Sequence, residues 1–177
     1  MSSALPPNRL LEIEQALNKR WPENKIEPSL DRIIALLDAL GSPQLSYPTI
    51  HLAGTNGKTT TARMIDQLLT ELGYRVGRYT SPHLESFTER ISIKGAPISD
   101  EMMIKTYDDI ALYLDLIDSR QPIPISYFEG ITAMAFVAFA EYPVDVGVIE
   151  AGMGGQWDAT NVLSSLVSVM TPIGFDH

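Results

Sequence analysis

Two hydrophobic patterns alternate along the chain. Apolar residues three or four positions apart predict amphipathic helices, and short runs rich in valine and isoleucine predict buried strands. The helical pattern covers about residues 8–19, 29–40, 58–72, 99–118 and 126–142. The strand pattern covers residues 49–53, 75–80, 90–93, 144–150 and 166–171. Because helices separate most of the strands, these patterns predict a three-layer α/β domain with a mostly parallel sheet covered on both faces.

Single residues mark where several of these elements should begin and end. Ser29 is a suitable N-cap for the second helix, and Gly41 and Gly73 are suitable residues just beyond helix C-termini. The helix over 126–142 is apolar nearly all round, which predicts that it is buried. We expect residues 1–46 to form a helical segment that packs on the core, and residues 47–177 to form the main domain.

Composition and charge exclude several classes of protein. The 177 residues contain no cysteine, so a disulfide framework, a thiolate metal site and a cysteine nucleophile are all excluded. The formal net charge of −9 argues against a nucleic-acid partner. No secretory signal and no apolar run of membrane-spanning length is present, so we expect a cytoplasmic protein without a membrane partner. An acidic protein that binds an anion must do so locally, through backbone N–H groups, a helix N-terminus, a lysine or a metal ion.

One segment meets that requirement, between a predicted strand and a predicted helix. Residues 53–60 read Ala-Gly-Thr-Asn-Gly-Lys-Thr-Thr. Glycines let the backbone aim its N–H groups at phosphate oxygens, the lysine reaches the terminal phosphates, and a hydroxyl binds the metal ion. Leu52 stands where the general pattern G-x-x-x-x-G-K-S/T has glycine, and the alternative is a hairpin turn beside a lysine. We predict a nucleotide site made by Gly54, Thr55, Asn56, Gly57, Lys58, Thr59 and Thr60.

Four further segments accompany this loop. They are Thr-Ser-Pro-His-Leu at 80–84, Phe-Thr-Glu-Arg-Ile at 87–91, the glycine-rich stretch from Glu150 to Asn161, and Thr-Pro-Ile-Gly-Phe-Asp-His at 171–177. Together with the loop, they resemble the folylpolyglutamate synthase/dihydrofolate synthase family of the Mur ligase superfamily. The resemblance implies a P-loop (Rossmann-like) ATPase domain that uses ATP and Mg²⁺. It also implies ligation of L-glutamate to dihydropteroate or a folate through an acyl phosphate.

The resemblance also implies roles for particular residues. It assigns catalysis to Lys58, Glu150 and His177, and contacts with Mg²⁺ to Ser81, Glu150, His177 and Thr60. Ser81 and Glu150 follow predicted strands, where ligands bind in open α/β sheets. The role of His177 rests on the resemblance alone. Thr59 and Thr60 compete for the hydroxyl role: the family often has glycine after the lysine, so Thr60 matches its hydroxyl, whereas Thr59 matches the general P-loop and the Mur ligases.

The resemblance further implies a pterin-binding region, which we place at two short segments. Its residues are Ser126, Tyr127, Phe128, Glu129, Trp157, Asp158 and Ala159. Tyr127, Phe128 and Trp157 are candidates to stack on the flat ring, and the two carboxylates are candidates to accept hydrogen bonds from its amino groups. For the aromatic residues, packing in the core is the alternative. Gln156 stands where the family commonly has arginine.

The resemblance predicts a longer protein than this chain. Family members continue past the Asp-His segment into a glutamate-binding C-terminal domain. We therefore expect this chain to be most of the N-terminal ATPase domain, truncated before that second domain and inactive in ligation by itself. We expect the complete protein to be a monomer, and the last strand to leave a sheet edge open to another copy.

Two rival functions stay open at this stage. A Mur ligase that acts on a peptidoglycan precursor is favoured weakly by Thr59, but the segments at 80–84 and 87–91 match the folate branch. A P-loop NTPase that serves as a binding module would lack a small-molecule acceptor. Within the folate branch, the sequence does not decide between dihydrofolate synthase, folylpolyglutamate synthase and an enzyme with both activities.

Overall fold

Six strands form one sheet in this computed structural model, which describes residues 8–21 and 29–174. The strands are β1 (Thr49–Ala53), β2 (Val76–Tyr79), β3 (Ile91–Ile93), β4 (Ala96–Pro97), β5 (Val146–Glu150) and β6 (Val167–Met170). Their order across the sheet is β4-β3-β2-β5-β1-β6. Strands β2, β5, β1 and β6 are parallel, whereas β3 and β4 run antiparallel to their neighbours. The prediction of a mostly parallel sheet is confirmed.

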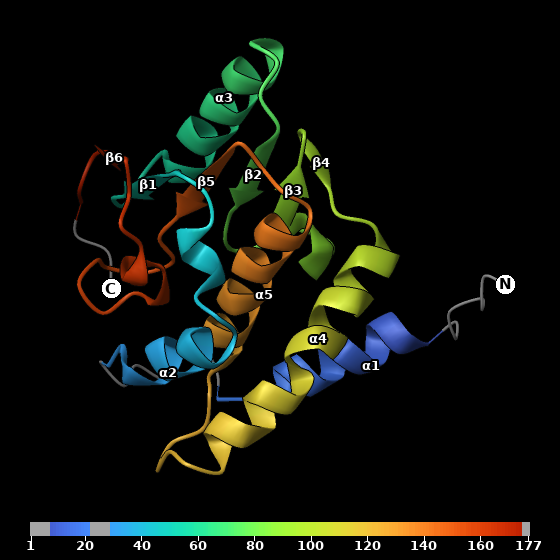
Figure 1. Cartoon of the computed structure of the whole chain (residues 1–177). Coiled ribbons are helices and arrows are strands. Elements are labelled where there is room, and N and C mark those ends of the chain that lie inside the picture. The colour runs from blue at the N-terminus through green and yellow to red at the C-terminus, as the bar shows by residue number, and fades with distance from the viewer. Residues whose placement is uncertain (1–7, 22–28, 175–177) are drawn as a thin grey trace, which may run out of the picture.

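Helices cover both faces of the sheet, as the alternating pattern predicts (Figure 1). They are α1 (Arg9–Asn18), α2 (Asp31–Ala39), α3 (Lys58–Glu71), α4 (Asp100–Asp118) and α5 (Tyr127–Glu141). Helix α3 lies alone on one face, and α5 lies on the other with α1, α2 and α4 outside it. Along β5, Val148 belongs to the apolar cluster under α3 and Ile149 to the larger cluster around α5. This alternation of side chains gives the three layers.

Helix α5 is the centre of the larger cluster. All of its residues from Gly130 to Phe139 are buried, in agreement with the prediction from its apolar composition. Ile13 and Leu17 of α1 and Ile33 of α2 belong to the same cluster and are fully buried. The N-terminal helices therefore share the core with α5. The division of the chain at residue 46 stays a prediction.

The predicted strand over 90–93 begins one residue late, and a short helix precedes it. Residues of η2 (Phe87–Arg90) form a 3₁₀ helix, because Ser86 and Glu89 make a capping box around its first turn. The sequence pattern also missed β4, which is only two residues long and follows a tight turn at Lys94 and Gly95, both with positive φ (54° and 76°). Two further 3₁₀ helices, η1 (Pro43–Leu45) and η3 (Ala159–Val162), lie in predicted loops.

The predicted helix ends are largely confirmed. Gly41 and Gly73 follow α2 and α3 with φ of 80° and 92°, the left-handed conformation that glycine adopts without strain. Ser29 lies one residue before the N-cap, Leu30, but its hydroxyl still accepts a hydrogen bond from the Asp31 N–H at 3.0 Å. The signal for the start of α2 was therefore correct to within one residue.

Strand β6 is at the edge of the sheet, and no described strand pairs with its outer side. Leu166, Val167 and Met170 are 76%, 46% and 68% exposed. The expected open edge is therefore present and carries apolar side chains. Within residues 8–21 and 29–174, no helix is both long enough and apolar enough to cross a membrane.

Candidate functional site

The loops that follow β1, β2, β5 and β6 lie together beyond the carboxyl ends of these strands. These four strands are parallel, so their carboxyl ends meet there. In open α/β sheets, ligands bind outside the carboxyl ends of the strands. Most of the residues that the sequence nominated lie in these loops or at the start of α3, and the backbone therefore brings distant segments together.

The glycine-containing loop between β1 and α3 has the backbone shape that a phosphate loop requires. Gly54 has φ of 136°, and a Cβ atom at this position would lie 2.2 Å from Thr171 Oγ1. Gly57, the N-cap of α3, has φ of 82° and open space where a Cβ would be. Lys58 Nζ donates to the Gly54 carbonyl at 2.7 Å and so closes the loop on itself. Both glycines are needed for conformation, and Gly54 also for the close approach of β6.

The first half of this loop is tied to the end of β6. The Thr55 and Asn56 N–H groups both donate to the Pro172 carbonyl, at 3.0 and 3.2 Å. The Thr55 hydroxyl donates to the Gly174 carbonyl at 3.3 Å. The sequence nominated Thr55 and Asn56 as nucleotide contacts, and this remains a prediction; in the structure their N–H groups already have an acceptor.

The second half of the loop opens onto the N-terminus of α3. Among the residues that the structure describes, no side chain caps this terminus. The first N–H groups of a helix lack acceptors within the helix, and the helix dipole makes this end positive. A loop of this shape at an uncapped helix start is a suitable place for phosphate oxygens.

A buried carboxylate faces the start of α3. Glu150 ends β5 and is only 2% exposed, and the Thr59 hydroxyl donates its hydrogen to this carboxylate, with Oγ1 2.9 and 3.0 Å from its two oxygens. Burial raises the pKa of Glu150, while the Thr59 hydroxyl, the Lys58 charge and the Ser81 backbone N–H act to lower it. A carboxylate from the end of β5 and a hydroxyl and a lysine from the start of α3 therefore lie close together.

This arrangement bears on the choice between the two adjacent threonines. Thr59 contacts Glu150, whereas Thr60 is exposed. The resemblance assigned the metal-side hydroxyl to Thr60, but the geometry favours Thr59. His177 lies outside the described residues. Within those residues, no group of three or more histidine, aspartate or glutamate side chains is placed to hold a metal ion.

The Phe-Thr-Glu-Arg segment organises the loop that follows β2. The Glu89 carboxylate accepts hydrogen bonds from three backbone N–H groups, including that of Ser86 at 3.0 Å, and these bonds lower its pKa. Arg90 Nε donates to His83 Nδ1 at 2.9 Å, and its guanidinium lies 5.1 Å from the centre of the Tyr127 ring. Glu89 therefore holds the backbone of the loop that follows β2, which contains Ser81. Arg90 connects this loop to Tyr127 at the start of α5.

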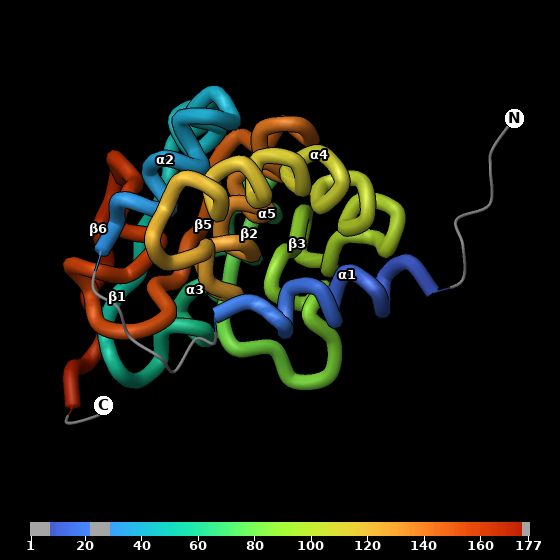
Figure 2. The backbone as a smooth tube through the Cα atoms, turned by 90° about the horizontal axis from the view of Figure 1, so that it is seen from below, coloured from blue at the N-terminus to red at the C-terminus, as the bar shows by residue number. Residues whose placement is uncertain are grey.

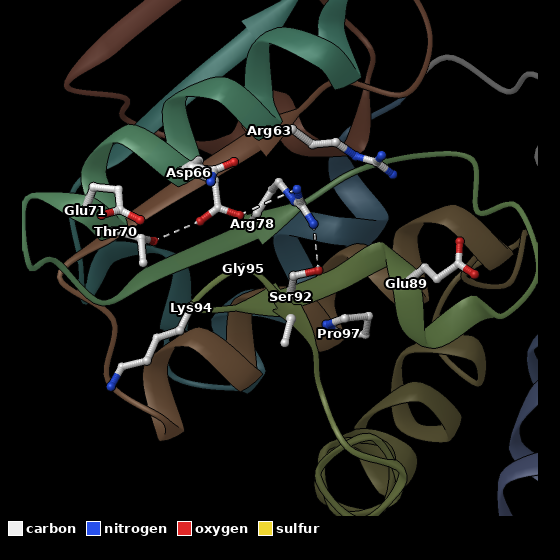
Figure 3. Close-up of a pocket in the computed structure, with 12 residues that line it drawn as sticks. Arg63, Asp66, Thr70, Glu71, Arg78, Glu89, Ser92, Lys94, Gly95 and Pro97 are labelled. Atoms are coloured by element: carbon white, nitrogen blue, oxygen red, sulfur yellow. Dashed lines mark hydrogen bonds and ion pairs between the residues drawn. The ribbon is translucent and has the colours of Figure 1, made fainter.

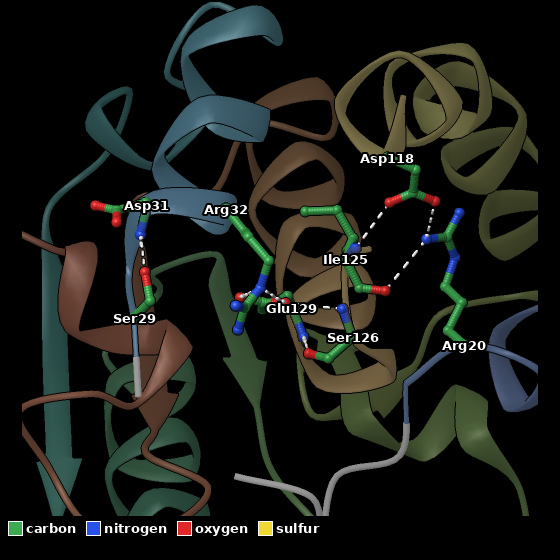
Figure 4. A network of polar contacts seen from close by, with 8 residues as sticks. All are labelled: Arg20, Ser29, Asp31, Arg32, Asp118, Ile125, Ser126 and Glu129. Atoms are coloured by element: carbon green, nitrogen blue, oxygen red, sulfur yellow. Dashed lines mark hydrogen bonds and ion pairs between the residues drawn. The ribbon is translucent and has the colours of Figure 1, made fainter. Parts of the chain in front are cut away.

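Two of the nominated substrate residues start helix α5. The Ser126 hydroxyl accepts from the Glu129 N–H at 3.1 Å, and the Glu129 carboxylate accepts from the Ser126 N–H at 2.7 Å. Arg32 Nε lies 3.1 and 3.2 Å from the two Glu129 carboxylate oxygens (Figure 4). Glu129 is 4% exposed. The Glu129 carboxylate thus has a structural role, because it binds Arg32 and the Ser126 N–H. Its role as a hydrogen-bond acceptor for the substrate stays a prediction.

The nominated aromatic side chains differ in exposure. Tyr127 is buried, and Phe128 lies against Tyr79 with ring centres 6.1 Å apart. A Cβ on Gly152 would lie 2.5 Å from Phe128 Cζ, so this glycine lets the loop after β5 pass directly over the ring. Trp157 is 54% exposed. For Tyr127 and Phe128 the structure shows the packing that the sequence left as an alternative.

Asp158 holds the glycine-rich loop together from within. Its carboxylate accepts from the Thr160 N–H at 2.9 Å and the Met153 N–H at 2.8 Å, and it caps η3, which begins at the buried Ala159. Thr160 Oγ1 lies 2.8 Å from His51 Nε2. Burial lowers the pKa of His51, and the nearby Asp158 opposes that shift. As with Glu129, a substrate contact by Asp158 stays a prediction.

These features define an α/β domain in which a phosphate-type loop joins the first strand to the following helix, opposite a buried carboxylate. A family model described as the Mur ligase middle domain matches residues 52–177. The chain belongs to this family.

Similar proteins agree with this assignment. The chain is 57% identical to a dihydrofolate synthase/folylpolyglutamate synthase of Mycobacterium tuberculosis, over 95% of this chain and 36% of that protein. It superposes on M. tuberculosis folylpolyglutamate synthase complexed with ADP with a TM-score of 0.90, covering 96% of this chain and 38% of that one. With E. coli FolC in complex with DHPP and ADP, the identity is 33%, the TM-score is 0.84, and the coverage is 95% of this chain and 39% of that one. The chain thus spans little more than a third of these relatives.

Proposed function

We propose that this chain provides the nucleotide-binding part of an ATP-dependent ligase that joins L-glutamate to dihydropteroate, to tetrahydrofolate, or to both. The convergence of Lys58, Thr59 and Glu150 beside the phosphate loop carries this proposal. Its substrates come from the relatives, one of which is named for both activities and is 57% identical. We also propose that the protein works in the cytoplasm as a monomer, without a nucleic-acid partner, in keeping with its net charge of −9.

The reaction must bring two anions together, since a carboxylate has to approach the terminal phosphate of ATP. In this proposal, the N-terminus of α3 and Lys58 reduce the repulsion by binding the phosphate oxygens. Glu150, the Thr59 hydroxyl and Ser81 would hold Mg²⁺, and His177 is the further ligand that the resemblance implies. The side-chain oxygen atoms of Glu150, Thr59 and Ser81 suit this ion, which when bound supplies positive charge between the two anions.

The pterin is assigned to the surface near the start of α5 and the loop after β5. Trp157 is the exposed aromatic residue there, and we propose that it stacks on the ring. Ser126, Glu129 and Asp158 shape this surface by holding the backbone of the helix start and of the loop. Tyr127, Phe128 and Ala159 support it from beneath.

Release of phosphate from ATP tests the proposed reaction. The assay contains Mg²⁺, L-glutamate and either 7,8-dihydropteroate or tetrahydrofolate, with the chain alone and with the complete product of its gene. We expect the complete product to release phosphate only when glutamate and one of these acceptors are both present. Release that needs a peptidoglycan precursor instead, or that needs no small-molecule acceptor, would overturn the proposal in favour of one of its rivals.

A pair of adjacent substitutions tests which threonine serves the nucleotide site. Thr59→Val removes the hydroxyl that binds Glu150 and should weaken Mg²⁺-dependent binding of a non-hydrolysable ATP analogue about 10-fold, the value of one charge-assisted hydrogen bond. Thr60→Val is the matched control and should change the affinity less than about 3-fold. Titration calorimetry on the two variants measures both values. A larger loss in Thr60→Val would restore the assignment made from the resemblance.

A further inference from the structure

A buried cation lies beside the candidate metal-binding carboxylate. Arg78 of β2 pairs in register with Val148 of β5, two residues before Glu150. Residues two apart on a strand point to the same face of the sheet. Arg78 and Glu150 therefore lie on adjacent strands and share the face that α3 covers.

The guanidinium of Arg78 is held from two sides. Its Nη1 lies 3.5 Å from an oxygen of Asp66 on α3, and its Nη2 donates to Ser92 Oγ on β3 at 3.0 Å (Figure 3). The Thr70 hydroxyl donates to Asp66 at 3.3 Å. The side chains of Asp66 and Arg78 are only 3% and 11% exposed. Contacts from both helix and sheet therefore fix the position of this charge.

The surroundings of the pair add further charges. Arg78 and Asp66 line a cavity of about 570 Å³ between α3 and the β3–β4 hairpin, whose walls also carry Arg63, Lys94, Glu71 and Glu89. Burial lowers the pKa of Arg78, while Asp66 and Glu150 raise it. Burial raises the pKa of Asp66 and Arg78 opposes this, as expected for an ion pair. Glu150 therefore attracts Arg78 through space, and Arg63 also acts on both groups.

We propose that the two charges of the Asp66–Arg78 pair act in opposite directions on the affinity of the Glu150 site for a divalent cation, so that each largely cancels the other. In this proposal, Arg78 repels the cation and Asp66 attracts it, in both cases through space rather than by touching the metal. The two side chains therefore affect the metal site only through their charges and are not ligands of the metal. This inference rests on the proposed role of Glu150 in holding Mg²⁺. It implies that the Arg78 charge by itself lowers the affinity of the Glu150 site for a metal ion, and that the Asp66 charge offsets most of this effect.

Binding of Mn²⁺ alone, without nucleotide, tests the inference on the whole chain. Free Mn²⁺ is measured by electron paramagnetic resonance at low ionic strength, where charge effects are least screened. Arg78→Met should tighten binding roughly 3- to 10-fold, and Asp66→Asn should weaken it by a similar factor. The double variant should return to within about 2-fold of the unaltered chain, because both charges are gone. Lys94→Gln, an exposed cation on the same cavity, is the matched control and should have no effect.

The direction of these changes separates charge from packing. If the pair only supports the fold, Arg78→Met and the double variant should both weaken binding, which would overturn the inference. Arg78→Lys keeps the charge and should match the unaltered chain. Arg78→Gln removes the charge but keeps a hydrogen-bond donor, so it should tighten binding as Arg78→Met does and provides the test if Arg78→Met does not fold. Glu150→Gln tests the underlying site. If it abolishes Mn²⁺ binding while Arg78→Met fails to tighten it, the inference alone is wrong. If Glu150→Gln leaves binding unchanged, the proposed metal site is wrong as well.

Discussion

Replacement of Lys58 by methionine is expected to weaken the binding of Mg²⁺-nucleotide about 100-fold. In the structure, Lys58 Nζ donates to the Gly54 carbonyl at 2.7 Å, so its ammonium group already lies over the loop that should receive the phosphates. A lysine that contacts phosphate oxygens contributes charge-assisted hydrogen bonds, worth about 3 kcal/mol in total. Methionine keeps most of the length of the side chain but provides no charge.

The measurement is titration calorimetry with a non-hydrolysable ATP analogue. Lys94→Met removes a lysine that is exposed and distant from the phosphate loop, so it should change the affinity less than about 2-fold. Unfolding in urea should show that Lys58→Met leaves the fold intact. An affinity within about 5-fold of the unaltered chain would show that nucleotide does not bind at this loop.

The second large effect is expected at Glu129. Glu129→Ala removes the carboxylate that Arg32 Nε approaches at 3.1 and 3.2 Å and half of the capping box of α5. Breaking a buried ion pair costs about 3–5 kcal/mol, and the lost cap adds to it. We therefore expect the free energy of unfolding in urea to fall by about 4–6 kcal/mol in total, a large part of the stability of a domain of this size.

Glu141→Ala is the matched control, because Glu141 ends the same helix and its partner Lys105 is exposed. An exposed ion pair contributes less than about 1 kcal/mol, so this variant should be nearly as stable as the unaltered chain. A second measurement distinguishes the two roles of Glu129. If Glu129→Ala keeps its stability but loses binding of dihydropteroate, the role as a substrate acceptor is right and the structural role is wrong.

The fold was predictable because its signals are local. The apolar run of α5 and the glycines after α2 and α3 needed no knowledge of distant residues. Strand β4 was missed because two residues cannot show a period. The capping box at Ser126 and Glu129 was legible in the sequence, but Arg32 lies 97 positions from Glu129, and nothing local connects them.

The candidate site could be predicted only as a set of residue types near strand ends. Thr59 and Thr60 are adjacent and chemically identical, and only the rotation of α3 against β5 decides which hydroxyl meets Glu150. Similarly, Asp158 was legible as a polar residue in a glycine-rich loop. Only the folded structure shows that the Asp158 carboxylate accepts hydrogen bonds from the backbone of that loop.

The Thr55 and Asn56 N–H groups donate hydrogen bonds to the Pro172 carbonyl, just after β6. A movement of the phosphate loop should therefore also move this part of the chain. Ile173 follows directly and is 74% exposed, and the chain has no cysteine of its own. Ile173→Cys would therefore accept a single thiol-reactive fluorophore at a defined place, next to the loop that should rearrange when phosphates arrive. Helix α1 lies at the opposite end of the molecule from β6 (Figure 2), so an affinity tag before it would leave that optical signal undisturbed.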